Sequence, residues 1–173
     1  MTRRTFVHIF QFFIFMAVQI LLVRNVVLFN TAFCYIYIAF LLFLPIQMPR
    51  VSLLLLAFLS GITVDIFYDT VGINAAACVL LAFLRPYVLL VLTPRDDYEK
   101  NDTINLHVMG WRWFTVYALF LVFMHHFALF FLELGSFRAV GFTLAKVVLS
   151  TLLTYLVLII IQLLFFSVRR SGR

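Results

Sequence analysis

Long apolar runs dominate this chain and set the conditions under which it can fold. Of its 173 residues, 65% are hydrophobic and only 12% carry a charge. A helix needs about 20 apolar residues, at ~1.5 Å rise each, to cross a bilayer. The sequence therefore predicts an all-α integral membrane protein, a six-span helical bundle that makes residues 1–173 a single polytopic membrane domain. The six expected spans are Phe6–Val23, Thr31–Met48, Val51–Phe67, Ile73–Leu92, Trp113–Leu132 and Val140–Val168.

Two of these spans have unusual boundaries. Only Met48-Pro49-Arg50 separates the second from the third, which predicts a tight helical hairpin or one re-entrant pair. The first is followed by Arg24-Asn25 and lacks a small-residue cleavage site, so we expect a retained span rather than a signal peptide.

The positive charges favour one orientation. With six spans and cytoplasmic N and C termini, ten of the thirteen Lys and Arg residues lie on the inner side. Only Arg24 and Arg138 lie outside, and Lys146 falls within the last span. Because cytoplasmic loops carry the excess of basic residues, this is the expected topology. It also explains the net charge of +6 without nucleic acid. The inner residues are Arg3, Arg4, Arg50, Arg85, Arg95, Lys100, Arg112, Arg169, Arg170 and Arg173.

The segments between spans are short, which argues against an extramembrane catalytic domain. The longest, Thr93–Arg112, is interpreted as a solvated loop, with a docking site for a cytoplasmic partner as the alternative. We find no nucleophile–base set, Gly-rich phosphate loop or metal-ligand cluster, so we expect no enzyme activity, cofactor or metal. Cys34 and Cys78 lie within apolar runs and are expected to be small, buried, reduced thiols.

The most informative polar residue is Asp65. It belongs to a stripe of residues four apart that would share one helix face. Small residues in the stripe let another backbone approach closely, so Asp65 should face protein rather than lipid. In the structural interpretation, the Asp65 carboxylate accepts hydrogen bonds from a hydroxyl such as that of Thr63, from Asn74, or from the backbone amides that open the fourth span. The alternatives are a partner-binding carboxylate or an ion carrier. The candidate partner-binding or helix-packing residues are Ala57, Gly61, Asp65, Asp69, Gly72, Asn74 and Ala75.

Other polar residues within spans have simpler expected roles. Arg85 should extend to the inner interface, and Gln19 belongs to a polar stripe of the first span that should face the bundle. His125 and His126 point about 100° apart on a helix and are interpreted as buried histidines rather than metal ligands. Lys146 is expected to extend outward or to pair with Asp65 or Glu133.

The order of these features resembles a known family. The segment Leu59-Ser-Gly61-Ile-Thr-Val-Asp65, followed by Gly72-Ile-Asn-Ala75, in a six-span chain with basic ends, is similar to the rod shape-determining protein MreD family. The chain differs at Asn30-Thr31-Ala32-Phe33, where the family often has a Pro-Asp pair.

This resemblance implies a non-catalytic membrane scaffold of the bacterial cell-elongation complex, in the inner (cytoplasmic) membrane. Such a protein would bind MreC, a single-span protein with a periplasmic coiled coil. It would thereby link MreB filaments to the SEDS glycosyltransferase and its transpeptidase, which act in lateral peptidoglycan synthesis and rod shape.

The alternative is a substrate-binding membrane subunit of an energy-coupling-factor vitamin transporter. These subunits are also six-span proteins of about this size. A vitamin would then bind near the outer face, where Asp65, Asn74 and Glu133 could gather.

Overall fold

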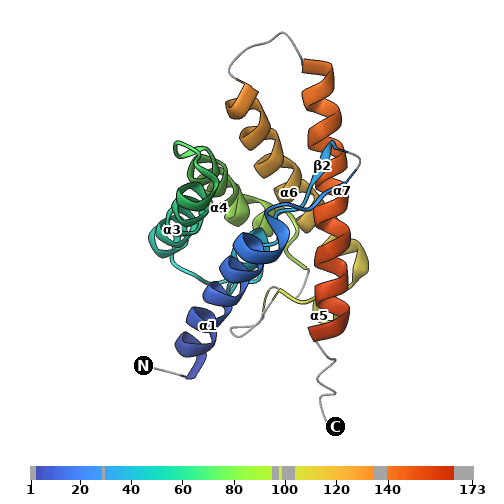
Figure 1. Cartoon of the computed structure of the whole chain (residues 1–173). Coiled ribbons are helices and arrows are strands. Elements are labelled where there is room, and N and C mark those ends of the chain that lie inside the picture. The colour runs from blue at the N-terminus through green and yellow to red at the C-terminus, as the bar shows by residue number, and fades with distance from the viewer. Residues whose placement is uncertain (1–2, 29, 95–97, 99–103, 135–139, 166–173) are drawn as a thin grey trace.

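The computed structural model describes residues 3–28, 30–94, 98, 104–134 and 140–165. Helices make up most of this part of the chain (Figure 1). Two short strands, β1 (Val27–Leu28) and β2 (Ala32–Phe33), pair antiparallel, with Val27 opposite Phe33. The helical segments are α1 (Arg3–Ala17), η1 (Val18–Val23), α2 (Ile38–Leu42), α3 (Arg50–Tyr68), α4 (Ile73–Val91), α5 (Leu106–Met109), α6 (Trp111–Leu134) and α7 (Val140–Phe165).

Four of these helices, α3, α4, α6 and α7, are long and apolar enough to cross a membrane. They correspond to the third to sixth predicted spans. The predicted first span is shorter as an apolar helix, Val7–Val23, and its second part is the π-helical η1. The protein is therefore a helical, multi-pass membrane protein.

The second predicted span does not form a long helix. Residues 31–48 contain β2, an irregular stretch, and the five-residue helix α2, so the prediction of a continuous helix over Thr31–Met48 was wrong. Proline at position 45 prevents α2 from continuing. The segment is nevertheless buried, with every residue from Tyr37 to Leu44 at most 8% exposed. Irregular backbone at membrane depth is tolerated only when protein covers it.

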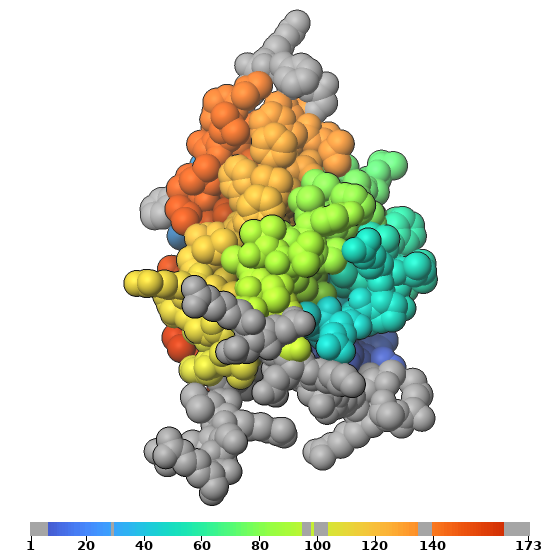
Figure 2. Space-filling view, turned by 180° about the vertical axis from the view of Figure 1, so that it is seen from behind, coloured from blue at the N-terminus to red at the C-terminus, as the bar shows by residue number. Residues whose placement is uncertain are grey.

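The long helices are arranged as two hairpins around this buried segment. Helix α4 packs against both α3 and α6, and α6 packs against α7. Figure 2 shows α3, α4, α6 and α7 covering one face of the molecule, with α4 between α3 and α6. On the other side, β2 contacts α7, and α1 contacts both α2 and α3.

The two ends of the bundle carry different groups. The η1 end, as we name it, contains η1, the α3–α4 turn and the end of α6, where Arg24 lies 3.9 Å from Asp69. The Arg85 end contains Pro45, Arg85 and the start of α6, where the Trp113 indole donates to the Leu92 carbonyl at 2.8 Å. Helix α1 begins and α7 ends at the Arg85 end (Figure 1). Residues 95–97 and 99–103 of the predicted polar loop, and the whole C-terminal basic cluster, lie outside the described residues, whereas α5 and the buried Ile104 and Leu106 belong to the described part of that loop.

Candidate functional site

The α3–α4 hairpin contains the predicted stripe of small and acidic residues. Ala57, Gly61 and Asp65 are buried on the face of α3 that packs against α4. A Cβ added to Gly61 would lie 2.3 Å from the Ala75 Cα. Only glycine at this position therefore permits the backbones of α3 and α4 to approach so closely.

Asp65 uses this close approach to cap α4 from the preceding helix. Its Oδ1 accepts from the Asn74 amide at 3.0 Å and from Asn74 Nδ2 at 3.1 Å, and also from the Thr70 hydroxyl. Its Oδ2 accepts from the Ala75 amide at 2.9 Å. The first amides of a helix have no intrahelical partner, and the positive end of the helix dipole favours an anion there. These are the hydrogen bonds expected from the structural interpretation of Asp65.

The turn between the two helices explains two further candidate residues. Asp69 is exposed, has a φ of 55°, and donates its amide to the Asp65 carbonyl as the C-cap of α3. Gly72 has a φ of 78° and is the N-cap of α4, with no atom within 4 Å of an added Cβ. Glycine is needed at position 72 for its left-handed backbone rather than for close packing.

A buried hydrogen-bond chain leads from Asp65 into the bundle. Because Asn74 Nδ2 donates to Asp65, its Oδ1 faces Tyr37 and accepts from the Tyr37 hydroxyl at 3.1 Å. Tyr37 Oη also lies 3.0 Å from His125 Nε2. The hydroxyl has one hydrogen, which goes to Asn74, so His125 must donate from Nε2. Its Nδ1 is then an acceptor, and it has no partner among the described residues.

His126 carries its proton on the other nitrogen. Its Nδ1 lies 2.7 Å from the Val122 carbonyl, which only accepts, so Nδ1 is the donor. Its Nε2 faces the Thr154 hydroxyl at 3.4 Å. The two adjacent histidines therefore connect to different parts of the bundle. In the described part of the chain, no group of three His, Cys, Asp or Glu side chains is placed to hold a metal ion.

Side chains also bind the irregular backbone around β2. The Phe33 amide donates to Ser150 Oγ at 2.9 Å, and the Tyr35 amide to Thr154 Oγ1 at 3.2 Å. On the other side, Gln19 in η1 donates to the Cys34 carbonyl at 3.3 Å and accepts from the Tyr37 amide at 3.4 Å. The expectation that Gln19 faces the bundle is thus met.

Arg85 occupies a position that the sequence did not predict. It is 1% exposed rather than extended to the interface. Its Nε donates to the Tyr117 hydroxyl at 2.9 Å, and its terminal nitrogens donate to the carbonyls of Leu44 and Pro45. These carbonyls follow the C-terminus of α2, where a cation is favourable. Arg85 therefore fixes the end of the buried segment.

Two further ion pairs lie near the η1 end, Arg24 with Asp69 and Lys146 with Glu133. Lys146 pairs with Glu133 at 3.0 Å, one of the two partners predicted for it. Asn74 and Glu133 both line a small cavity there, but Asp65 does not. The structure thus brings together two of the three residues considered for ligand binding, whereas Asp65 is used within the hairpin.

Comparison of the chain with models of protein families, with curated proteins and with solved structures gave no match.

Proposed function

We propose that the protein is a non-catalytic scaffold of the bacterial cell-elongation complex in the inner membrane. It would bind an MreC-like single-span protein and connect it to wall synthases and MreB filaments. The proposal combines the MreD-like sequence pattern with one structural observation, which is that the buried polar residues bond to each other in a fixed network.

This network favours a structural over a transport role. Asp65 accepts four hydrogen bonds, from Thr70, Asn74 and Ala75. A carrier carboxylate has to exchange a proton or ion with water on each side of the membrane. Asp65 instead has both oxygens occupied by its own hairpin, at 2% exposure. The polar groups hold a defined shape in lipid, which is what a scaffold requires.

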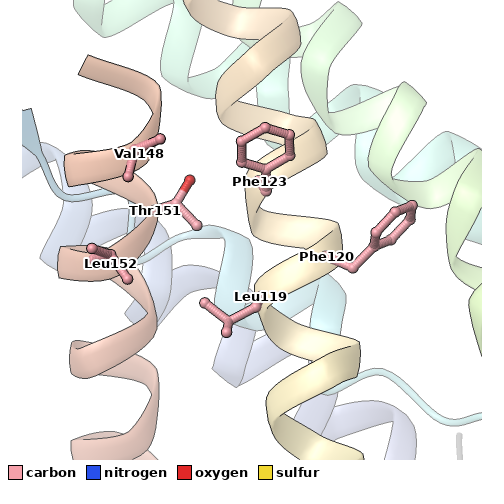
Figure 3. Close-up of a pocket in the computed structure, with 6 residues that line it drawn as sticks. All are labelled: Leu119, Phe120, Phe123, Val148, Thr151 and Leu152. Atoms are coloured by element: carbon pink, nitrogen blue, oxygen red, sulfur yellow. The ribbon is translucent and has the colours of Figure 1, made fainter. Parts of the chain in front are cut away.

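A groove between α6 and α7 is our candidate for the partner-binding surface. It has a volume of about 330 Å³ and, apart from one hydroxyl, an apolar lining. Figure 3 shows Thr151 directed from α7 toward α6. The Thr151 hydroxyl is buried and has no hydrogen-bond partner among the described residues. A partner helix that brings a polar side chain to this depth would satisfy it. The groove is lined by Leu119, Phe120, Phe123, Val148, Thr151 and Leu152.

Site-specific photo-crosslinking tests this proposal. A photoreactive phenylalanine analogue at Phe120, which lines the groove, should crosslink an MreC-like protein in the native membrane. The matched control is Phe58 on α3, which is 49% exposed compared with 43% for Phe120. Equal crosslinking from both positions would argue against the groove. If purification in mild detergent recovers neither an MreC-like protein nor wall synthases, the scaffold proposal is wrong.

A vitamin-binding transporter subunit is the second candidate, because a cavity at the η1 end includes Asn74 and Glu133. Its volume is about 230 Å³, whereas pockets for small molecules usually span about 300–1,000 Å³. The size therefore favours a smaller ligand than most vitamins. Co-purification of paired ATPases with a large coupling subunit would support the transporter and contradict the scaffold.

A further inference from the structure

The cavity at the η1 end has a more polar lining than the groove between α6 and α7. Five segments of the chain contribute to it, and its volume of about 230 Å³ corresponds to roughly eight waters at ~30 Å³ each. Its lining includes two tyrosines, two amide side chains and a charge of each sign. These residues are Arg24, Asn25, Tyr35, Tyr68, Asn74 and Glu133.

The positive charge at the cavity is only weakly neutralised within the chain. Arg24 lies 3.9 Å from Asp69, whose side chain is 91% exposed, so water screens this pair. The Arg24 guanidinium also lies over the Tyr68 ring, 5.4 Å from its centroid. The Tyr68 hydroxyl accepts from Gln19 at 2.7 Å, which leaves its own hydrogen available for donation. An incoming anionic group would therefore find a cation and a hydroxyl donor together.

The negative charge at the cavity comes from the end of α6. Glu133 bonds Lys146 through Oε2, and its side chain is 52% exposed. The Lys146 ammonium lies over the rings of Phe33 and Phe130, at 4.7 Å and 4.5 Å from their centroids. Glu133 Oε1 accepts no described hydrogen bond and is available to an incoming cation.

We propose that this cavity binds a small zwitterionic ligand, with its phosphate or carboxylate at Arg24 and its ammonium group at Glu133. Around the cavity, the charges of Arg24 and Lys146 balance those of Asp69 and Glu133. A neutral ligand with separated charges suits such a site better than a net anion or cation. Tyr35 provides aromatic surface for the ammonium group. The cavity does not depend on the proposed scaffold function.

Two sources can supply this chemistry. Helices α3 and α6 end at this cavity and α4 begins there. A bilayer spanned by these helices would place the cavity near the phospholipid head groups, so a zwitterionic lipid such as phosphatidylethanolamine is one source. A free zwitterion such as phosphoethanolamine is the other. The cavity volume admits a head group, while the acyl chains would lie along the apolar helix surfaces outside it.

Lipid retention measured by native mass spectrometry tests the proposal. The purified full chain is exchanged into detergent with equal amounts of phosphatidylethanolamine and phosphatidylglycerol. We expect preferential retention of phosphatidylethanolamine, and at least about a tenfold weaker retention of both lipids in Arg24→Gln, because both carry the phosphate that Arg24 would bind. Arg50→Gln is the matched control, because Arg50 also lies over a tyrosine ring but belongs to the opposite end of α3.

The competing outcomes are distinct. Competition by phosphoethanolamine, without selective lipid retention, would support the site with a free zwitterion as its ligand. Equal retention of both lipids without such competition would overturn the proposal, as would equal losses in Arg24→Gln and Arg50→Gln. Glu133→Gln should weaken phosphatidylethanolamine more than phosphatidylglycerol. An equal effect on both lipids would exclude Glu133 as the group that binds ammonium.

Discussion

Replacing Gly61 with alanine is the sharpest test of the α3–α4 contact. The new Cβ would lie 2.3 Å from the Ala75 Cα, 2.5 Å from the Ala75 nitrogen and 2.6 Å from the Asn74 carbonyl oxygen. All three are backbone atoms, so no side-chain rotation relieves the clash. Since ordinary contact begins near 3.4 Å, the two helices must separate by about 1 Å.

This separation has a cost that follows from the Asp65 cap. The bonds from the Asn74 and Ala75 amides, now 3.0 and 2.9 Å long, would stretch beyond hydrogen-bonding distance. Their loss costs about 0.6–2 kcal/mol each, and overpacking adds about 1–3 kcal/mol. The higher helix propensity of alanine offsets about 0.5–1 kcal/mol of this destabilisation. We therefore expect Gly61→Ala to lower the free energy of unfolding by roughly 4 kcal/mol, the middle of a range of about 1–6 kcal/mol.

The two native cysteines allow this to be measured. Cys34 and Cys78 are free and buried, and Cys78 lies one turn after Ala75 on α4. A thiol-reactive fluorophore should report unfolding in detergent at a melting temperature roughly 5–15 °C lower than wild type. Gly141→Ala is the control, because nothing lies within 4 Å of its added Cβ. If Gly61→Ala melts at or above the temperature of this control, the close contact does not limit stability.

The same assay tests three further side chains. Asp65→Asn removes an acceptor from the Ala75 amide and should cost about 1–3 kcal/mol, whereas the exposed Asp69→Asn should change stability by less than about 0.5 kcal/mol. Arg85→Lys should cost about 1–3 kcal/mol, since a lysine cannot reproduce the fork of donors; wild-type stability would show that the guanidinium bonds contribute little. Thr154→Val leaves a backbone amide unpaired and should cost about 1–3 kcal/mol. Thr63→Val, which loses only a bond to its own helix, should be nearly neutral, and equal effects of the two threonine variants would refute this reasoning.

The long helices were predictable because hydropathy alone specifies them. The predicted span Val51–Phe67 is found as Arg50–Tyr68, and Ile73–Leu92 as Ile73–Val91. The structural role of Asp65 at the junction of these two helices was also predictable, because Asn74 and the backbone amides that Asp65 caps lie close to it in sequence. The role of Asp65 in partner binding stays a prediction.

The long-range part of the site was not predictable in this way. Tyr37, His125 and Gln19 meet only because three segments distant in sequence converge. For Arg85, the general tendency of arginine to reach the interface gave the wrong expectation. The position of Arg85 beside Pro86, near the end of a span, indicated its depth in the membrane but not that protein would bury it. The carbonyls that it binds belong to a segment that was expected to be helical and to need no donors.

The buried segment shows why hydropathy misjudged residues 31–48. An apolar run is equally compatible with a membrane helix and with an extended strand inside a bundle. The distinguishing signal is that Phe33, Tyr35 and Tyr37 alternate, with aromatic residues that favour strands. In a strand, amides two residues apart are about 6.7 Å apart, and on a helix, side chains four residues apart are about 6 Å apart.

Ser150 and Thr154 have this helical spacing, and they bind the amides of Phe33 and Tyr35 in order. The polar face of α7 therefore accepts hydrogen bonds from the backbone amides of the extended segment, as a neighbouring strand does in a sheet. Because these amides have their hydrogen-bond partners on α7, the segment can be extended only while α7 keeps this register. A helix that appears uniformly apolar thus carries, one turn apart, two hydroxyls that bind the amides of the extended stretch around Phe33 and Tyr35.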